Sequence, residues 1–404
     1  MVISDPAILV INCGSSSAKF ALFADERDVR RRLWSGSLDR IGLADGRFRA
    51  IDESGNAVVD ETRAIPEHAQ ALRMLLDMFA RHSSGVSPIA VGHRVVHGGA
   101  DCDCPLPVDE VLLTRLRRLV PLAPLHLPHN LAGIAAVRGV RPDRPQVACF
   151  DTAFHHGLPR LARLTGLPRA FADEGILRYG FHGLSYEYVM TELRRRYGPN
   201  VAKECIVVAH LGNGASMAAI RDGRSVDTTM GFSTLGGLPM GTRSGDLDPG
   251  IVLYLLMEKG MTAQQVQQLL YEQSGLLGLS SLSRNMQELL ARADTAPAAA
   301  EAVDFFCYQA RKHLAALTAT IGGLDRLVFT GGIGANAPEI RARICDGLAY
   351  LGILLDETRN AAGERTISNH GSDVVVEAFA TDEELMIARH VRQVCADRPL
   401  ALEA

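Results

Sequence analysis

The chain has 404 residues, of which 47% are hydrophobic and 22% are charged. This length exceeds what a single hydrophobic core usually supports, so we expect two globular domains. The formal net charge of −4 creates no overall positive field, which argues against nucleic acid and anionic membranes as partners.

The N-terminus and the cysteines predict a cytoplasmic protein. The sequence MVISDPAILVIN lacks the basic segment of a signal peptide, and no stretch approaches the ~20 apolar residues of a membrane span. The eight cysteines form no CxxC pair, and several stand within apolar segments, as reduced thiols do. The histidines show no ligand spacing, so we expect no dedicated zinc site.

Strand and helix patterns alternate along the chain, which predicts an α/β fold. Apolar segments of strand length occur at 7–12, 18–23, 89–96, 146–150, 204–209, 216–220, 326–330 and 373–379. Three later segments carry helix-start signals, namely Asp248 with Pro249, the capping box Thr262 and Gln265 with Gly275 at the far end, and the capping box Thr381 and Glu384.

One pattern occurs twice. LVINCGSSSAKFALF at 9–23 and VVAHLGNGASMAAI at 207–220 each combine an apolar strand, a Gly-rich polar turn and a second strand. A third strand, RLVFTGG, leads into IGANAPEIR and a helix that starts at Pro338. The repetition predicts two halves that are built alike, each presenting a hairpin turn toward a shared cleft.

These turns contain the groups that bind phosphate. Backbone amides and hydroxyls converge on the anion, glycine permits close approach, and the first turn adds the cation Lys19. One Gly-rich turn alone is more often an ordinary hairpin, but three of them favour phosphate binding. The chain has no GxxxxGK[ST] motif, and GGIGAN lacks the third glycine of a dinucleotide fingerprint, so P-loop enzymes and dehydrogenases are disfavoured.

Charged residues also interrupt or end apolar segments in the middle of the chain. Arg94 lies in VGHRVVHGG, Asp151 follows VACF, His182 precedes a helical pattern, and Arg243 stands in GLPMGTRSGDLDPG. A buried charge needs a partner or a ligand, and a simple pair between Arg94 and Asp151 is an equally good interpretation. Taken together, the arginines, the histidine, the carboxylate and the turns meet the requirements of phosphoryl transfer.

The ordered motifs NCGSSSAK, GHRVVHGG, LAPLH, FDTAFH, YGFHG, HLGNGAS, GTRSGDLDPG and FTGGIGAN resemble the acetate/propionate kinase family of the sugar kinase–Hsp70–actin superfamily. The resemblance implies an α/β fold of two similar domains of the actin-like ATPase (ribonuclease H-like) type with a central interdomain cleft. It implies one domain of residues 1–150 plus 385–404, with the C-terminal helix packed back, and a nucleotide-binding domain of residues 151–384.

The resemblance also implies roles at the matching positions. The residues expected to act on the transferred phosphoryl group are Lys19, Arg94, Asp151, His182 and Arg243. Those expected at the nucleotide are Ser15, Ser17, Lys19, His210, Leu211, Gly212, Asn213, Gly214, Asn285, Met286, Gln287, Gly331, Gly332, Ile333, Gly334 and Ala335. The acyl group is expected at Arg94, Val96, Leu125 and Phe181, and the metal ion at Asn12, Asp151 and Glu383.

The implied reaction is ATP + acetate ⇌ ADP + acetyl phosphate, by direct in-line transfer with Mg²⁺, for which Mn²⁺ is the expected substitute. Acetate is already an anion near neutral pH, so the reaction needs no general base. The family implies a homodimer. Three alternatives stay open: a propionate-preferring kinase, a pyrophosphate-linked kinase of the same family, and a non-catalytic actin-like nucleotide-binding protein. A pure switch needs no carboxylate-binding arginine, which argues against the last.

The chain departs from the family pattern near the expected nucleotide and histidine sites. Asn285-Met286-Gln287 replaces an Asp-x-Arg segment near the nucleoside, and Ala335 replaces a glutamate. Tyr186 replaces the second histidine of HGTSH. The central lysine, arginines, aspartate and first histidine are all retained, so these departures concern substrate preference rather than the reaction.

Overall fold

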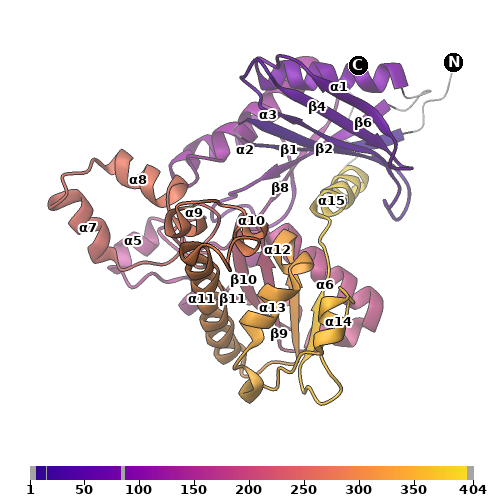
Figure 1. The fold of residues 1–404 in the computed structure, drawn as a ribbon. Helices are drawn as coiled ribbons and strands as arrows, with labels where there is room; N and C mark the ends of the chain where they lie inside the picture. Colours follow the sequence, from indigo (N-terminus) through magenta and orange to yellow (C-terminus); the bar gives the residue numbers. More distant parts are fainter. Residues whose placement is uncertain (1–5, 15, 83–86, 398–404) are drawn as a thin grey trace. The chain divides into compact units, whose positions relative to one another are not determined.

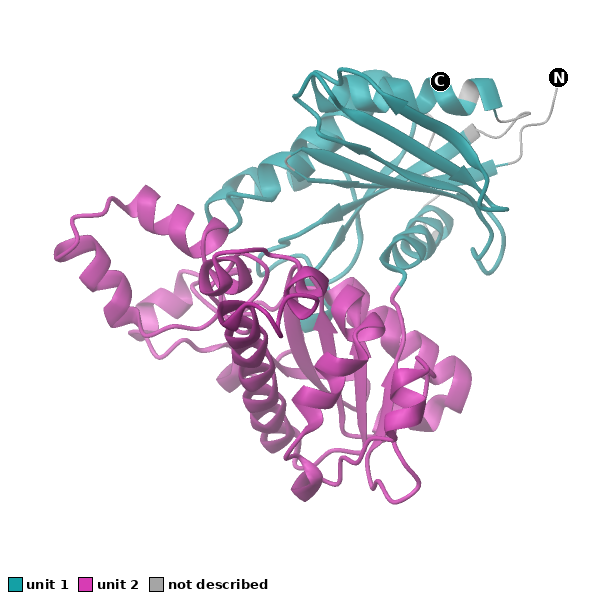
Figure 2. Cartoon of the chain, in the orientation of Figure 1, with its two compact units in different colours: residues 1–156, 382–404 teal, residues 157–381 magenta. Residues whose placement is uncertain are grey.

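The computed structural model describes residues 6–14, 16–82 and 87–397 (Figure 1). It divides into unit 1, Met1–His156 with Asp382–Ala404, and unit 2, Gly157–Thr381 (Figure 2). Each unit contains one β-sheet with helices, so the predicted α/β class is confirmed. The domain limits expected from the sequence differ by a few residues from these unit boundaries, and the structure places Asp151 and Glu383 in unit 1.

Unit 1 is built on an eight-stranded sheet with the order β5-β4-β3-β2-β1-β6-β8-β7. Its strands are β1 (Pro6–Cys13), β2 (Ser17–Ala24), β3 (Arg32–Asp39), β4 (Arg47–Asp52), β5 (Ala57–Thr62), β6 (Ser87–Val95), β7 (Leu106–Pro107) and β8 (Gln146–Phe150). Its helices are α1 (His68–His82), α2 (Glu110–Arg118), α3 (Leu127–Val140) and α15 (Glu383–Asp397), with short 3₁₀ turns η1 (Val120–Leu122) and η2 (Ala153–His155).

Helices cover β1 on both faces, which explains its uninterrupted apolar sequence. Leu9 and Ile11 belong to a core that includes residues of α1 and α3. The C-terminal helix α15 packs on β1, β6 and β8. At Gly92 on β6, a Cβ atom would clash with Ile387 and Val391 of α15, so glycine permits the close approach.

Unit 2 is built on a five-stranded sheet with the order β11-β10-β9-β12-β13. Its strands are β9 (Ile206–Leu211), β10 (Ala215–Arg221), β11 (Arg224–Thr228), β12 (Arg326–Thr330) and β13 (Val375–Ala378). Its helices are α4 (Arg160–Arg163), α5 (Arg169–Asp173), α6 (Gly183–Tyr197), α7 (Pro249–Met257), α8 (Ala263–Glu272), α9 (Gly275–Ser280), α10 (Met286–Leu290), α11 (Pro297–Ile321), α12 (Gly331–Asn336), α13 (Pro338–Cys345) and α14 (Glu357–Ala361), with η3 (Pro199–Lys203) and η4 (Ala349–Leu351). The long helix α11 packs along β9, β10 and β11 (Figure 1).

The same arrangement of five strands occurs in each of the two sheets, which confirms the predicted internal repetition. In β3-β2-β1-β6-β8 and in β11-β10-β9-β12-β13, the first three strands are antiparallel and the next two are parallel to the middle strand. The hairpins β1–β2 and β9–β10 therefore occupy equivalent places in the two units.

Two helix-end predictions were wrong. Helix α8 has the predicted Thr262–Gln265 capping box but ends before Gly275, which instead begins α9 with φ +60. A side chain at Gly275 would collide with the backbone of Met240. Helix α15 is capped by Asp382, whose carboxylate accepts the Leu385 N–H at 3.0 Å, so Thr381 is not the N-cap.

Candidate active site

The first Gly-rich segment forms the end of the β1–β2 hairpin. Asn12 and Lys19 are cross-strand partners, and the Gly14 N–H donates to the Ser17 carbonyl at 2.8 Å. Asn12, Ser17 and Lys19 are thus strand residues rather than parts of a long turn. Ser15 lies outside the described residues. Lys19 is exposed, so its ammonium group is accessible to an anion at this end of the hairpin.

A buried asparagine connects this hairpin to strand β6. The Asn130 side chain, 3% exposed, donates to the Cys13 carbonyl at 3.0 Å and accepts the Val96 N–H at 3.1 Å. It therefore bridges the last residue of β1 and the residue that follows β6. Val96 itself is buried, whereas Leu125, the second expected acyl contact in unit 1, is exposed.

Arg94 and two carboxylates form the charged cluster of unit 1. Nε of Arg94 lies 2.9 Å from Oδ1 of Asp151, and Nη2 lies 2.6 Å from Oδ2. Glu383, the first residue of α15, places Oε2 3.9 Å from Nε of Arg94. The structure therefore brings together three predicted site residues, and it contains the Arg94–Asp151 pair that the sequence left open.

Burial and charge act in opposite directions in this cluster. Burial alone would lower the pKa of Arg94, but the carboxylates of Asp151 and Glu383 outweigh it and raise that pKa. Burial raises the pKa of the Asp151 carboxyl, and Arg94 opposes that rise. The guanidinium consequently stays charged at every pH at which the protein folds, and it is a fixed cation for an anionic substrate.

In unit 2, His182 lies beside the β9–β10 hairpin. It precedes α6 in the left-handed conformation, with φ +58, and its ring stacks on His210 with centroids 4.4 Å apart. Its Nδ1 lies 2.8 Å from Oγ of Ser216 on β10. Phe181, the expected acyl contact in unit 2, is buried next to it in the chain.

Arg243 and His182 converge on Gly214. A Cβ atom built on Gly214 would lie 3.3 Å from Nε2 of His182 and 3.8 Å from Nη1 of Arg243. Nη1 of Arg243 also donates to the Thr234 carbonyl at 3.1 Å, which fixes the guanidinium. An imidazole and a guanidinium therefore flank the glycine-rich turn, as a phosphoryl-binding site requires.

Several of the residues expected at the nucleotide line a cavity of about 530 Å³ in unit 2. The predicted residues that line it are Gly212, Asn213, Asn285, Met286, Gln287, Gly332 and Ile333. Its volume lies in the range of cofactor and ligand pockets. Gly331, with φ +76, permits the sharp entry into α12, because a side chain there would meet the Leu211 backbone. Gly334 and Ala335 lie in α12, while Leu211 ends β9 and is fully buried.

Sequence reasoning missed several residues of this cavity. Its wall also includes Arg284, Leu290, Asn336, Ala337, Pro338 and Glu339. Arg284 and Leu290 belong to no Gly-rich motif, whereas Asn336, Ala337, Pro338 and Glu339 lie in IGANAPEIR, directly after the predicted site residues of α12. Residues of α10, α12 and the start of α13 thus line one cavity. The available signal was the position of Arg284 before Asn285 and of Asn336 after Ala335.

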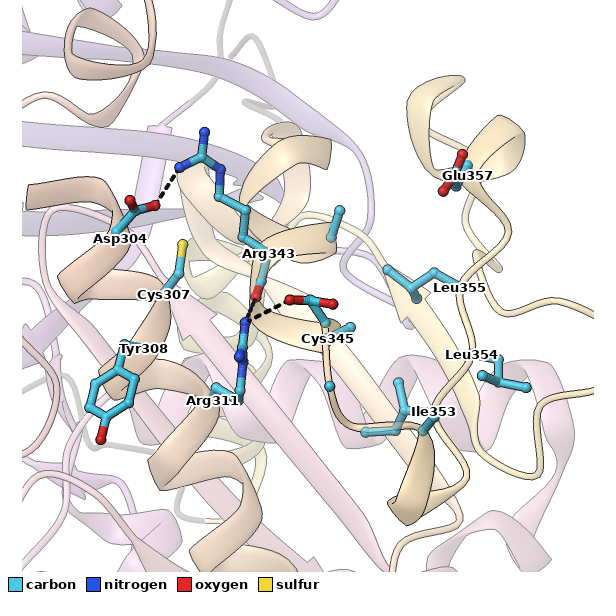
Figure 3. Close-up of a pocket in the computed structure, with 14 residues that line it drawn as sticks. Asp304, Cys307, Tyr308, Arg311, Arg343, Cys345, Ile353, Leu354, Leu355 and Glu357 are labelled. Carbon is cyan, nitrogen blue, oxygen red and sulfur yellow. Dashed lines mark hydrogen bonds and ion pairs between the residues drawn. The ribbon is translucent and has the colours of Figure 1, made fainter. Parts of the chain in front are cut away.

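A second cavity, of about 730 Å³, contains none of the predicted site residues (Figure 3). Its charged groups bind one another: Arg343 contacts Asp304 at 2.6 Å and also pairs with Glu339, while Arg311 donates to the carbonyls of Arg343 and Ile344. These contacts join α11 to α13, so the arginines at this cavity stabilise the packing of unit 2.

The three residues expected at the metal ion all belong to unit 1. Asn12, Asp151 and Glu383 offer amide and carboxylate oxygens, the ligand class that Mg²⁺ prefers, and Mg²⁺ usually takes only one or two protein carboxylates besides substrate phosphates. Within the described residues, no three or more His, Cys, Asp or Glu side chains are grouped to hold an ion by themselves. Among the helices in the described ranges, none has the length and apolarity needed to cross a membrane.

Comparison with solved structures places the chain in a class of kinases with the actin-like ATPase fold, which confirms the predicted fold class. Acetate kinase from Porphyromonas gingivalis has a TM-score of 0.87 and 34% identity, and covers 96% of this chain and 99% of its own. A propionate kinase from Francisella tularensis subsp. tularensis has a TM-score of 0.89 and 35% identity with the same coverage.

The sequence comparisons define the family. The acetate kinase of Nitrobacter hamburgensis is 47% identical over 97% of this chain and 97% of its own length. That of Rhodopseudomonas palustris (strain ATCC BAA-98 / CGA009) is 48% identical over 95% of this chain and 97% of its own. The model of the acetokinase family matches residues 7–389. The chain belongs to the acetokinase family, as its motifs indicated.

Proposed function

We propose that the chain is an acetate kinase, which transfers a phosphoryl group from ATP to acetate and yields ADP and acetyl phosphate. The observation that carries the proposal is the likeness at 47% identity, over nearly the full length, to an acetate kinase. Arg94 in the charged cluster of unit 1 and Arg243 in unit 2 supply the cations that the reaction requires, and His182 adds a hydrogen-bond donor beside Arg243.

Each unit has its own part in this proposal. Arg94, held by Asp151, binds an anionic oxygen of the substrate. The cavity beside Gly212, Met286 and Ile333 receives the nucleoside, and Lys19 and Ser17 contact phosphate oxygens. His182 and Arg243 donate to the oxygens of the phosphoryl group during direct in-line transfer. Asn12, Asp151 and Glu383 would hold Mg²⁺ or Mn²⁺, which supplies charge neutralisation at the phosphates when it is bound.

The nucleotide cavity favours ATP over pyrophosphate as the phosphoryl donor. Met286 and Ile333 line it, and apolar side chains suit a base but would serve no purpose for pyrophosphate. The relatives at 47% and 48% identity are acetate kinases, which favours acetate over propionate, although one methylene changes binding by only about 1–3 kcal/mol.

Hydroxylamine trapping tests these choices, because it converts an acyl phosphate into a hydroxamate, which forms a coloured complex with ferric iron. Purified protein with Mg²⁺ is supplied with ATP or pyrophosphate and with acetate or propionate. We expect hydroxamate with ATP, and a higher kcat/KM for acetate than for propionate. Hydroxamate with pyrophosphate but not with ATP would support the pyrophosphate-linked alternative. A higher kcat/KM for propionate than for acetate would support the propionate-preferring alternative. Absence of product in all four mixtures would support a nucleotide-binding protein without activity.

We also propose a cytoplasmic homodimer. The support for the dimer is α7, an apolar helix in which no residue is buried: Leu253 is 57% exposed and Met257 75%. A face of this kind usually meets a partner, and we assign it to a second copy of the chain. Analytical ultracentrifugation should give a molecular mass twice the 43.6 kDa of one chain. Leu253→Glu should reduce this mass, whereas Gln264→Glu on the neighbouring α8 should leave it unchanged. A wild-type monomer would contradict the assignment.

A further inference from the structure

Three residues of unit 2 form a hydrogen-bonded chain that ends at His182. Oη of Tyr186 lies 2.5 Å from Oγ of Ser216, and that Oγ lies 2.8 Å from Nδ1 of His182. Tyr186 is in the first turn of α6 and Ser216 is on β10, and both are fully buried. We propose that Tyr186 is a positioning residue that acts through Ser216 to keep a proton on Nε2 of His182.

The direction of the hydrogen bonds follows from the chemistry of the two hydroxyl groups. A phenol is a stronger donor and a weaker acceptor than an aliphatic hydroxyl, because its oxygen lone pair is delocalised into the ring. Tyr186 therefore donates to Ser216. The serine hydroxyl has a single proton, which it then donates to Nδ1 of His182. A neutral imidazole that accepts at Nδ1 carries its proton on Nε2.

The position of Nε2 makes this proton useful. Nε2 faces the site where Gly214 lacks a side chain, and Nη1 of Arg243 borders the same site. With a proton, Nε2 donates to an anionic oxygen there. Without a proton, it would present a lone pair to that oxygen and repel it. The stacked ring of His210, 4.4 Å away, restricts the imidazole to this orientation.

The alternative interpretation is that Tyr186 only fills the core. Burial raises the pKa of its hydroxyl, although the hydrogen bond with Ser216 acts against this, so the phenol keeps its proton in either case. The two interpretations differ in what removal of the hydroxyl group does. A purely structural role predicts lower stability with unchanged catalysis, whereas a positioning role predicts a lower kcat in a protein that is still folded.

The inference rests on the proposed function, so the first test measures kcat and KM for acetyl phosphate formation. We expect Tyr186→Phe to lower kcat about tenfold, as loss of a histidine-orienting partner does, with little change in either KM. Tyr188→Phe, the same change two residues along α6, is the control. Ser216→Ala should match Tyr186→Phe, and the double variant should lose no more than Ser216→Ala alone. Tyr186→His, which restores the family residue, should recover part of the activity.

The second test does not depend on activity. Long-range ¹H–¹⁵N spectra of histidine-labelled protein report which ring nitrogen carries the proton, and a His182→Asn variant assigns the signal. We expect the neutral Nε2–H form in the wild type and a mixture of forms in Tyr186→Phe. The Nδ1–H form in the wild type, or an unchanged spectrum and kcat in Tyr186→Phe, would overturn the inference. An inactive wild type with the expected spectrum would instead reject only the proposed function.

Discussion

Arg94 and Asp151 lie at the ends of neighbouring parallel strands, β6 and β8, and both carboxylate oxygens of Asp151 accept from the guanidinium of Arg94. The carboxylate is 2% exposed and the guanidinium side chain 19% exposed. This pairing fixes the direction of the guanidinium without removing it from solvent. Arg94 is therefore a preorganised binding group, and Asp151 sets its orientation.

The first prediction concerns this pair. Asp151→Asn keeps the size of the side chain but replaces one acceptor oxygen by a donor, so Arg94 loses its two-point hold. We expect kcat/KM for acetate to fall about 100-fold, roughly 3 kcal/mol of transition-state stabilisation. Asp60→Asn, which weakens the exposed pair of Arg47 and Asp60, is the control and should leave the kinetics unchanged. Wild-type kinetics in Asp151→Asn would show that the pair is only structural.

The second prediction concerns the nucleotide cavity. Asn285 and Gln287 line it but offer no charge, unlike the Asp-x-Arg segment of the family pattern. The double change Asn285→Asp with Gln287→Arg should lower KM for ATP about fivefold, which corresponds to about one added hydrogen bond. Gln268→Arg, an exposed position on α8, controls for added charge. If the double variant binds ATP no better, these side chains do not face the nucleotide.

The third prediction is a dependence of stability on pH. Burial lowers the pKa of His93 to about 4, although the hydrogen bond with Gln146 acts in the opposite direction. The unfolded chain binds this proton below its ordinary pKa of about 6.5, whereas the folded protein does not bind it until near pH 4. The contribution of His93 to the free energy of unfolding is therefore fully present above pH 6.5. It is lost as the pH decreases toward 4, and the loss amounts to about 3 kcal/mol.

Urea unfolding at several pH values measures this dependence. His93→Asn should flatten the slope of unfolding free energy against pH between 6.5 and 4. His370→Asn, at an exposed position, should leave the slope as it is in the wild type. An identical slope in all three proteins would mean that folding does not lower the pKa of His93.

The fourth prediction separates stability from catalysis. Glu377 on β13 is fully buried and accepts from Arg326 at 2.8 Å, Arg365 at 2.9 Å and Tyr197 at 3.1 Å. Glu377→Gln leaves two arginines without a buried counter-charge, which should lower the unfolding free energy by about 3 kcal/mol. Chemical denaturation checks this value, and kcat should not change.

An exposed pair provides the comparison for that result. Glu339→Gln, which weakens the exposed pair with Arg343, should cost at most about 0.5 kcal/mol by the same measurement. Equal losses in the two variants would contradict the importance assigned to the buried network.

The strands that are easiest to predict from the sequence are those covered on both faces of a sheet. Strands β1, β9 and β12 have helices or strands packed around them, so each contains a continuous apolar segment that is easily recognised. Strands β3, β4 and β5 were not predicted. They form one edge of the unit 1 sheet, and the outermost strand, β5, has no buried residue, so their polar residues resemble those of a loop.

The residues of the candidate site also differ in how well the sequence predicts them. Residues within Gly-rich motifs, such as Gly212 and Ile333, were found because the backbone at a phosphate site needs glycine. The roles of Ser216 and Tyr186 were not found, because Ser216 is 30 residues from Tyr186 in the chain and only the packing of α6 on the β9–β10 hairpin joins them. Hydrogen bonds between distant segments leave no periodic pattern in a sequence.

The most direct test of the central claim is a ³¹P NMR spectrum of the purified protein with ATP, Mg²⁺ and acetate. We predict that the ATP signals decrease while signals of ADP and acetyl phosphate increase in equal amounts. Unchanged ATP, or ADP that forms with inorganic phosphate and no acetyl phosphate, would contradict the claim that this chain phosphorylates acetate.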